Sequence, residues 1–225
     1  MDTLSQPVCS SRGAPSRRAI LLTGLAGAGK TLLLGRLSEL GEQVIDLERL
    51  ANHSGSVFGG LGRPQQPSHN QFQQLVSNAW LSANPESLLW LEDEGPFIGS
   101  VGVPLWLLET MSQLPAVEVV AEREERISRL VEHYGSIPMA DLEAALIRLA
   151  QRLDRSRLDA ALNGIRAGLL RDAIEIALDY YDSAYNHRLT RQRRRTLATY
   201  RSREDDPAEL IRLVGSRNVR GDLDA

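Results

Sequence analysis

The chain has 225 residues, of which 42% are hydrophobic and 24% are charged, and its formal net charge is −3. These values are ordinary for a globular protein, and the slight acidic excess excludes a molecule that binds polyanions over its whole surface. The chain has no apolar run long enough to cross a bilayer, and its one cysteine allows no internal disulfide, so we expect a cytoplasmic protein.

The first predicted elements are a tail, a strand and a helix. Residues 1–17 are rich in Ser, Pro and Arg, and we expect them to be a flexible tail that carries Cys9. The apolar run at residues 18–23 predicts a buried strand. Residues 31–40 predict a helix. Its apolar positions are Leu33, Leu37 and Leu40.

The segment GLAGAGKT at residues 24–31 is a complete phosphate-loop motif between this strand and this helix. Its glycines let backbone N–H groups face an anion, and the helix N-terminus adds partial positive charge. Lys30 is the only lysine in the chain, and its compact ammonium suits phosphate better than a wide guanidinium would. Thr31 is predicted to bind Mg²⁺. The predicted phosphate or nucleotide ligands are Gly24, Gly27, Ala28, Gly29, Lys30 and Thr31.

A second strand is predicted at residues 43–47, and a long loop at residues 51–67. The loop has few residues that build a core, and its polar side chains suit recognition, so we expect it to contact substrate. The residues assigned to this role are His53, Gly55, Ser56 and Gln66. Asp46 and Glu48 close the second strand at the sheet edge where ligands bind. An acid here is predicted either to act on an acceptor or to form a helix cap or turn, and Asp46 is the residue assigned to catalysis.

A helix at residues 70–80 precedes a third strand at residues 87–91, which runs into Glu92, Asp93 and Glu94. Carboxylates in this position hold Mg²⁺ in many phosphate-loop enzymes. Because successive strand residues point to opposite faces, Glu92 and Glu94 share one face and Asp93 lies on the other. Glu92 and Asp93 stay equal candidates, with a solvated acidic turn as the alternative. The predicted catalytic residues are Lys30, Asp46 and Asp93, and the predicted metal ligands are Thr31, Glu92 and Asp93.

The next elements are a short helix at residues 104–111, a strand at residues 115–121 and a helix at residues 122–134. The last of these carries three arginines of the kind that close over a nucleotide, Arg123, Arg126 and Arg129. The alternation of strands and helices predicts an α/β fold, a P-loop NTPase-like parallel sheet with flanking helices. From about residue 141 to residue 187 the pattern is only helical, which indicates a helical insertion or subdomain.

A last strand at residues 195–200 and a last helix at residues 207–214 complete a predicted domain of residues 18–214, and we expect residues 215–225 to be a flexible tail. Several arginines lie at residues 188–195, just before and at the start of the predicted last strand. Such a cluster can neutralise RNA phosphates, or it can be a solvated surface. The predicted RNA-binding residues are Arg188, Arg191, Arg193, Arg194 and Arg195.

Five stretches of the chain resemble one family, the P-loop domain of tRNA 2-selenouridine synthase. They are GLAGAGKT, VIDLERLANHSGSVFG, QPSHNQF, LEDEGPFIGSVGVP and DYYDSAYNHRL, and they run from about residue 20 to residue 189. The loop alone is generic, but the combination is specific. The family usually shows arginine where this chain has Ser54.

The resemblance implies a transferase that replaces sulfur by selenium at C2 of the wobble 2-thiouridine of tRNA, through a geranylated intermediate. The implied ligands are Mg²⁺ and ATP, geranyl diphosphate or selenophosphate, and the residues do not choose among the three. The implied partner is tRNA, with no DNA and no membrane. The family pattern includes a rhodanese domain with a reactive cysteine, for which residues 1–17 are too short, so we expect a separate rhodanese-domain partner. The alternatives are a small-molecule kinase and a non-catalytic nucleotide-binding adaptor.

Overall fold

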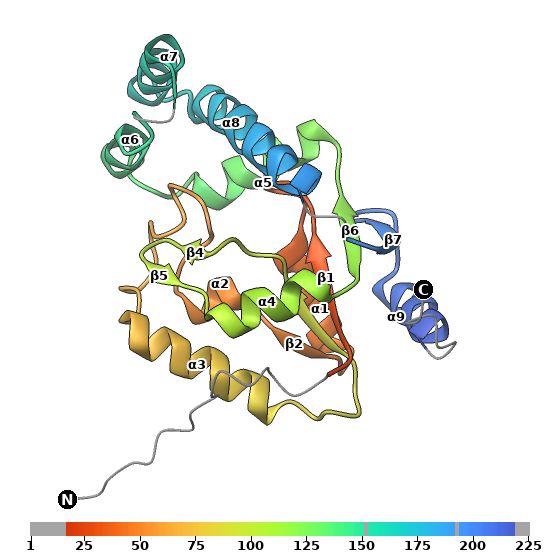
Figure 1. The fold of residues 1–225 in the computed structure, drawn as a ribbon. Helices are drawn as coiled ribbons and strands as arrows, with labels where there is room; N and C mark the ends of the chain where they lie inside the picture. Colours follow the sequence, from red (N-terminus) through yellow and green to blue (C-terminus); the bar gives the residue numbers. More distant parts are fainter. Residues whose placement is uncertain (1–16, 151–152, 192–193, 219–225) are drawn as a thin grey trace, which may run out of the picture.

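The computed structural model describes residues 17–150, 153–191 and 194–218. Its centre is a five-stranded parallel sheet in the order β2-β3-β1-β6-β7 (Figure 1). The strands are β1 (Ala19–Thr23), β2 (Gln43–Ile45), β3 (Leu89–Glu92), β6 (Ala116–Val120) and β7 (Thr196–Arg201). The predicted P-loop NTPase-like α/β fold is therefore confirmed.

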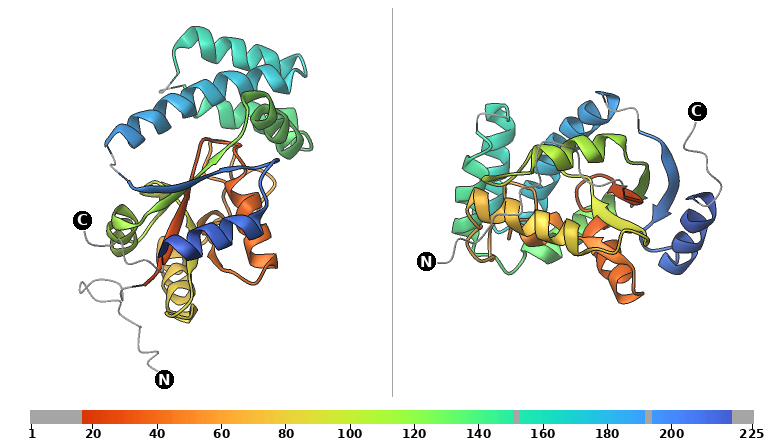
Figure 2. Two further views of the ribbon diagram at one scale, coloured as in Figure 1. Left: turned by 90° about the vertical axis from the view of Figure 1, so that its right-hand side faces the viewer. Right: turned by 60° about the horizontal axis from the view of Figure 1, so that its bottom comes forward.

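Both faces of the sheet are covered because each central strand is apolar on both sides. In β1, Leu21 packs toward the helices α3 (His69–Ser82) and α4 (Leu105–Gln113), together with Phe72 and Met111. Its neighbours Ile20 and Leu22 pack on the opposite face, which α1 (Lys30–Glu39) and α9 (Pro207–Asn218) cover (Figure 2). The period of two along the strand thus divides the core into two layers.

Four helices lie together at one end of the sheet, beyond the carboxyl ends of the strands (Figures 1 and 2). They are α5 (Arg123–Tyr134), α6 (Met139–Ile147), α7 (Arg155–Arg166) and α8 (Leu170–Arg191). They share a third apolar cluster, which includes Leu142, Leu146, Ile165 and Leu178. Helices α6 to α8 occupy the stretch for which the sequence predicted only helices, about residues 141–187, and α5 precedes that stretch.

Three short elements were not predicted: α2 (Leu47–Leu50) and the antiparallel hairpin of β4 (Phe97–Ile98) and β5 (Val101–Gly102). Segments of two to four residues are too short for a periodic pattern to reveal them. Of the apolar positions in the predicted first helix, Leu33 and Leu37 are buried, while Leu40 is the C-cap residue of α1 and is 52% exposed.

The predicted tails lie mostly outside the described residues, and Cys9 is among the residues that the structure does not describe. Arg17 belongs to the folded part, since its Nη1 donates to the carbonyl oxygen of Ala83 at 2.8 Å and its guanidinium lies over the ring of Trp80. At the other end, α9 continues beyond the predicted residue 214 to Asn218. Over the part of the chain that the structure describes, no helix combines the length and the apolar character needed to span a membrane.

Candidate active site

The phosphate loop connects β1 to α1 and has a backbone that only glycine adopts easily. Gly24, Gly27 and Gly29 have φ values of 143°, 74° and 104°. A Cβ atom at Gly24 would also lie 2.3 Å from the carbonyl oxygen of Val119. Gly29 is the N-cap residue of α1, so the positive end of that helix lies at the loop. The glycines of the motif are therefore required by the curvature of the loop.

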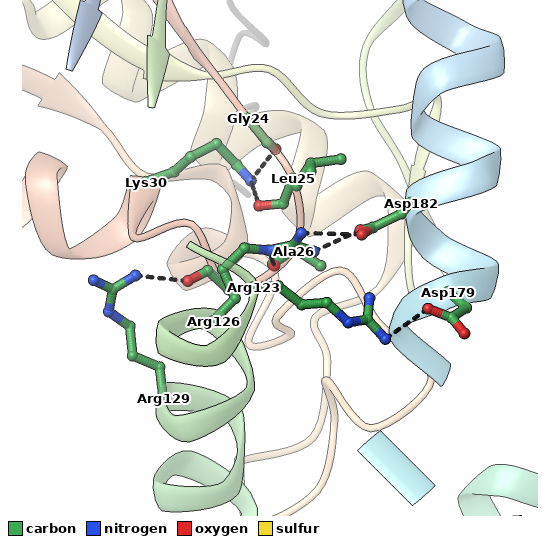
Figure 3. A network of polar contacts seen from close by, with 10 residues as sticks. Gly24, Leu25, Ala26, Lys30, Arg123, Arg126, Arg129, Asp179 and Asp182 are labelled. Carbon is green, nitrogen blue, oxygen red and sulfur yellow. Dashed lines mark hydrogen bonds and ion pairs between the residues drawn. The ribbon is translucent and has the colours of Figure 1, made fainter. Parts of the chain in front are cut away.

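Lys30 and Thr31 begin α1 and direct their polar atoms to different partners. The Nζ atom of Lys30 donates to the carbonyl oxygens of Gly24 at 2.8 Å and Leu25 at 3.4 Å, so the ammonium lies against its own loop (Figure 3). The hydroxyl of Thr31 donates to Oε1 of Glu92 at 2.7 Å. Within the first turn of α1, Lys30 thus places a cation at the phosphate loop and Thr31 places a hydroxyl at a carboxylate.

Three carboxylates gather next to Thr31. Glu48, Glu92 and Glu94 each offer an oxygen, and these oxygens lie within 4.8 Å of one another. Burial raises the pKa of Glu48 to about 8, with the charge of Glu94 as the next cause. Burial also raises the pKa of Glu92 well above its usual range, and the negative charges of Glu48 and Glu94 add to the shift. The cluster therefore favours protons or a cation.

The donor atoms of this cluster fit Mg²⁺. Carboxylate and hydroxyl oxygens are the ligands that this ion prefers. One of them, Oε2 of Glu92, is buried and has no hydrogen-bond partner among the described residues, which leaves a buried polar atom without compensation. Thr31 and Glu92 were predicted as metal ligands and lie together here, while Glu48 and Glu94 extend the set.

Asp93 was predicted as a catalytic residue and a metal ligand, but the structure pairs its carboxylate with an arginine. Its side chain is fully buried, and its Oδ1 lies 2.5 Å from Nη1 of Arg194, whose side chain is only 8% exposed. The physical reason is the alternation along the strand, which sends Asp93 away from Glu92 and Glu94. The carboxylate of Asp93, which was predicted as a metal ligand, thus forms a buried ion pair with Arg194.

Asp46 was also predicted to be catalytic, with a helix cap as the alternative, and the structure shows the cap. Its Oδ1 accepts a hydrogen bond from the backbone N–H of Arg49 at 2.7 Å and begins α2. The short helix then places Glu48, and not Asp46, beside Thr31. Asp46 acts at a distance, because its negative charge contributes to the raised pKa of Glu48 and Glu92.

The predicted substrate loop at residues 51–67 is better packed than its composition suggests. Phe58 is 3% exposed, and its ring centroid is 5.4 Å from that of Tyr134. The hydroxyl of Ser56 is 3.0 Å from the Tyr134 hydroxyl. Burial lowers the pKa of His53, as does the charge of Arg63, so His53 is neutral at pH 7. Part of this loop is therefore core, and the expectation that it contributes little to packing is wrong.

Gln66 was predicted to contact substrate, but its amide forms hydrogen bonds with other segments of the protein. Its Nε2 donates to the carbonyl oxygens of Ala51 and Ile98, both at 3.0 Å. Its Oε1 accepts from the backbone N–H of Ser100 at 2.9 Å and from the Ser100 hydroxyl at 3.0 Å. These bonds use the whole hydrogen-bonding capacity of the amide, so Gln66 fastens the loop to the β4–β5 hairpin.

Two arginines of α5 hold the phosphate loop from outside. Arg126 is 4% exposed, and its Nε donates to the carbonyl oxygen of Ala26 at 2.8 Å. Its two terminal nitrogens bind Asp182 of α8 at 3.0 and 2.6 Å. Arg129 donates to the carbonyl oxygen of Gly27 at 2.8 Å (Figure 3). Both guanidinium groups thus hold the phosphate loop through its carbonyl oxygens.

The third arginine of α5, Arg123, points to Asp179 of α8 at a distance of 2.7 Å. About half of each of these two side chains is exposed. The prediction that the α5 arginines close over a nucleotide is therefore not what the structure shows. All three are engaged by groups of the protein. α8 lies along α5 and supplies carboxylates to Arg123 and Arg126 (Figure 3), while Arg129 pairs with Glu125 of its own helix.

Two tyrosines of α8 complete the contacts between the helical subdomain and the loops. The hydroxyl of Tyr185 accepts a hydrogen bond from the backbone N–H of Gly24, and the hydroxyl of Tyr181 accepts one from Val57, both at 2.6 Å. One side of α8 therefore touches the start of the phosphate loop and the middle of the substrate loop. These contacts join residues that are more than 120 positions apart in the chain.

A cavity of about 800 Å³ connects these groups. Lys30, Thr31, Glu48 and Glu94 line its polar side. Its lining also includes apolar and aromatic side chains, those of Ala26, Leu130, Tyr134, Tyr181, Ala184 and Tyr185. Two exposed apolar side chains, Leu32 and Phe97, also line it. The cavity can therefore hold a ligand with a charged head and a less polar body.

The family described as "tRNA 2-selenouridine synthase AAA domain" matches residues 17–212. The chain belongs to this family. A tRNA 2-selenouridine synthase of Hahella chejuensis is 33% identical over 209 residues, which cover 79% of this chain and 54% of the relative. The corresponding protein of Pseudomonas putida is 34% identical over 170 residues, covering 71% of this chain and 45% of the relative. The chain spans about half the length of the curated relatives it matches.

Solved structures with a similar course of the chain include a shikimate kinase from Acinetobacter baumannii in complex with shikimate. Its sequence is 16% identical, its TM-score is 0.39, and the match covers 93% of this chain and 97% of that one. A protein called TT1252 from Thermus thermophilus is 17% identical with a TM-score of 0.44, and the match covers 90% of this chain and 98% of that one. At this degree of likeness neither structure indicates a function for the selenouridine synthase domain.

The stretches that carry the resemblance to the synthase family meet in the structure around the cavity. GLAGAGKT forms the phosphate loop, and LEDEG supplies Glu92 and Glu94. DYYDSAY lies on α8 and supplies Asp182 and the two tyrosines. Glu48 of the VIDLERL stretch joins the carboxylates. Segments that are far apart in the chain therefore build one site.

The predicted RNA-binding arginines of the synthase domain are only partly described. The structure describes no side chain for Arg188, Arg191 or Arg193. Arg194 belongs to the ion pair with Asp93 and is largely buried, so its assignment to an exposed RNA surface is wrong. Arg195 is exposed beside the start of β7 and stays a prediction.

Outside the carboxylate cluster, the residues of the site that sequence reasoning missed include Arg63, Tyr134, Tyr181 and Tyr185. All four line the cavity, but none lies in a short motif with its own chemistry. The sequence did contain a signal for the α8 residues. Positions 181, 182 and 185 lie on one side of a helix, which indicates that their side chains face a common region. What they touch could not be read from the sequence, since their partners lie on other elements.

Proposed function

We propose that this chain is the phosphate-binding part of a tRNA 2-selenouridine synthase, and that its cavity binds the phosphate-bearing donor of that reaction. The observation that carries the proposal is a single cavity with a phosphate loop, a carboxylate cluster and an aromatic wall, in a chain of this family. The named relatives are about twice as long as the part that this chain matches. Their whole activity, the tRNA and a rhodanese-domain protein acting in trans therefore belong to the proposal.

Among the candidate donors, we infer geranyl diphosphate. Its diphosphate suits Lys30 and the loop N–H groups. Its hydrocarbon chain suits the wall formed by Leu130, Tyr134 and Tyr185, which a ribose or a small inorganic donor would leave exposed to water. Selenophosphate has no apolar part, and ATP carries a polar base and sugar, so the apolar wall favours the prenyl donor for this cavity.

The residues have separate tasks in this proposal. Lys30 and the loop amides stabilise the negative charge that collects on the diphosphate when it leaves. Thr31 and Glu92, with Glu48 and Glu94, would hold Mg²⁺, which supplies positive charge to the phosphate oxygens when bound. Tyr185 and Arg126 hold the loop in shape through Gly24 and Ala26. Positioning and charge neutralisation are the main contributions of such a site.

The test is nucleoside mass spectrometry of tRNA from the source organism grown with selenite, with the gene deleted and then replaced by variants. Deletion should remove 2-selenouridine, and the wild-type gene should restore it. We expect Lys30→Ala to restore less than about 1% of the wild-type level, since loss of a charged transition-state contact costs several kcal/mol. Lys30→Arg keeps the charge but changes its shape, and should restore only a small part.

A parallel assay identifies the donor in the purified chain. Geranyl diphosphate, Mg²⁺ and a tRNA with 2-thiouridine are incubated with wild-type protein and with Lys30→Ala, and the tRNA is checked for the geranylated nucleoside. Full selenation in cells by Lys30→Ala would contradict the proposal. Transfer of phosphate from ATP to a metabolite without tRNA would favour a kinase instead. Nucleotide that binds and stays intact over a long incubation would favour an adaptor.

A further inference from the structure

The cavity contains a cation for which the proposed function has no role, Arg63 of the loop at residues 51–67. Its side chain is partly buried and lines the cavity. Only its backbone is fixed, by a hydrogen bond from its N–H to the carbonyl oxygen of Gly60 at 3.4 Å. In residues 17–150, 153–191 and 194–218, no hydrogen bond or ion pair engages its guanidinium. A guanidinium in such a place is available to a ligand.

The other cations of the cavity wall are already engaged. Among the described residues, the cationic side chains that line it are Lys30, Arg63 and Arg129. Lys30 lies on the carbonyl oxygens of its own loop. The guanidinium of Arg129 is held by the carbonyl oxygen of Gly27, the carboxylate of Glu125 and the hydroxyl of Ser202. Arg63 therefore differs from its neighbours in having five N–H donors and no acceptor among the residues that the structure describes.

Arg63 and Lys30 act on the carboxylate cluster from two sides. The positive charges of both lower the pKa of Glu48, against the stronger effect of burial. They belong to different segments, Lys30 to the phosphate loop and Arg63 to the substrate loop. The carboxylates thus lie within the electrostatic range of two cations, only one of which is part of the phosphate-loop motif.

The histidines near Arg63 do not replace it as an anion-binding group. Burial lowers the pKa of His53 and His133, and the charge of Arg63 lowers both further. Both imidazoles are therefore neutral at pH 7 and offer a single donor each. Arg63 is the permanent positive charge on this side of the cavity.

We propose that Arg63 binds a phosphate oxyanion of the second substrate, so that the cavity holds two anionic groups, one on the phosphate loop and one on Arg63. This rests on the proposed function, in which the donor diphosphate takes the phosphate loop. A guanidinium can bind a phosphate through two parallel N–H···O bonds, and partial burial strengthens them. The phosphate can come from two sources, a free phosphate-type substrate or a phosphodiester of the RNA that carries the target base.

The test counts anion sites on the purified chain by isothermal titration calorimetry. Inorganic diphosphate with Mg²⁺ first saturates the phosphate loop, and inorganic phosphate is then titrated as the second anion. Wild-type protein should bind both. Arg63→Gln should weaken phosphate binding about tenfold or more, as expected for loss of a charge-assisted pair, and leave diphosphate binding unchanged. Lys30→Ala should do the reverse, and Arg63→Lys should keep part of the phosphate affinity.

The matched control is Arg212→Gln, which removes the same charge from an exposed position on α9. It should bind both anions like the wild type, and circular dichroism should show that every variant is folded. If Arg63→Gln binds diphosphate and phosphate with the same affinities as Arg212→Gln in every assay, the inference is overturned. A wild-type chain that binds no diphosphate would contradict the proposed function, while its phosphate binding would still report on Arg63.

A second arm distinguishes the two sources of phosphate. The same variants are titrated into a fluorescent anticodon stem-loop RNA at one fixed salt concentration, because such affinities depend strongly on salt. Weaker RNA binding by Arg63→Gln, with Arg212→Gln unchanged, would identify a phosphodiester. Loss of inorganic phosphate binding with RNA binding intact would identify a free phosphate-type substrate. Either result supports the role of Arg63.

Discussion

Glu48 and Glu92 are carboxylates placed where burial opposes their charge. Burial raises the pKa of Glu48 to about 8 and that of Glu92 well above its usual range. The Thr31 hydroxyl compensates one oxygen of Glu92, while its other oxygen has no partner among the described residues. A buried charged carboxylate destabilises the folded state by itself, and a bound cation offsets this cost. Such groups are typical of functional sites.

This cost predicts a stability that falls as pH rises. The pKa of Glu48 is about 8 in the folded chain, against an ordinary value of 4.5, so the folded state keeps a proton that the unfolded chain loses. Its contribution is fully present below pH 4.5 and is lost as pH rises through 8. With EDTA present, the free energy of unfolding should fall by about 1–3 kcal/mol between pH 5 and pH 8, as measured by urea denaturation.

Glu48→Gln should flatten this dependence, because an amide does not titrate. Glu109→Gln on α4 changes an exposed carboxylate in the same way and should leave the slope as in the wild type. Mg²⁺ should bind more tightly as pH rises through 8, since it needs the deprotonated form. Identical slopes for the two variants would show that Glu48 does not carry the effect.

At the scale of the elements, two ion pairs join α5 to α8, and they differ strongly in burial. Arg126 and Asp182 form a two-bond pair with 4% and 19% of their side chains exposed, and Arg126 also holds the phosphate loop. Arg123 and Asp179 join the same helices, but about half of each side chain is exposed. Because water screens the second pair, only the first should contribute strongly to the position of α8.

The two pairs give a matched comparison. Arg126→Ala leaves the carboxylate of Asp182 without its partner and should lower the free energy of unfolding by about 3–5 kcal/mol. Arg123→Ala should cost about 1 kcal/mol or less. Urea denaturation followed by circular dichroism measures both. Similar losses in the two variants would contradict the assignment of Arg126 as the main link between α5, α8 and the phosphate loop.

Over the whole molecule, the helical subdomain and the sheet meet at the ligand site. The subdomain has its own apolar cluster, which is separate from the two clusters on the faces of the sheet. Its polar links to the phosphate loop include Tyr185 with Gly24, Arg126 with Ala26 and Arg129 with Gly27, and Ala26 also packs against the apolar cluster of the subdomain. A ligand that orders the loop should therefore also order α8.

Hydrogen exchange tests this coupling. Inorganic diphosphate with Mg²⁺ should slow amide exchange along α8 several-fold in the wild-type chain, because binding lowers the population of locally open states. Tyr185→Phe removes the acceptor for the Gly24 N–H and should reduce this protection. Tyr180→Phe, on the same helix but without a described contact to the loop, should not. Protection limited to the phosphate loop in all three proteins would contradict the coupling.

Several features of the site could be predicted because their causes are local. The phosphate loop depends on glycines at fixed spacing between a strand and a helix, and all of these lie within residues 19–39. The separation of Asp93 from Glu92 and Glu94 follows from the alternation of one strand. The role of Asp46 was open, because the short helix that it caps has no periodic pattern of its own.

The sequence by itself determined the α/β fold, the phosphate loop and the run of acids after β3, since each depends on residues that are neighbours in the chain. Only the tertiary structure decided that Glu48 joins Glu92, that Arg194 takes Asp93 and that Tyr185 reaches Gly24. Each of these contacts joins segments from different elements, whose relative positions come from the burial of three apolar clusters. Packing of the whole chain sets such distances, and no local pattern encodes them.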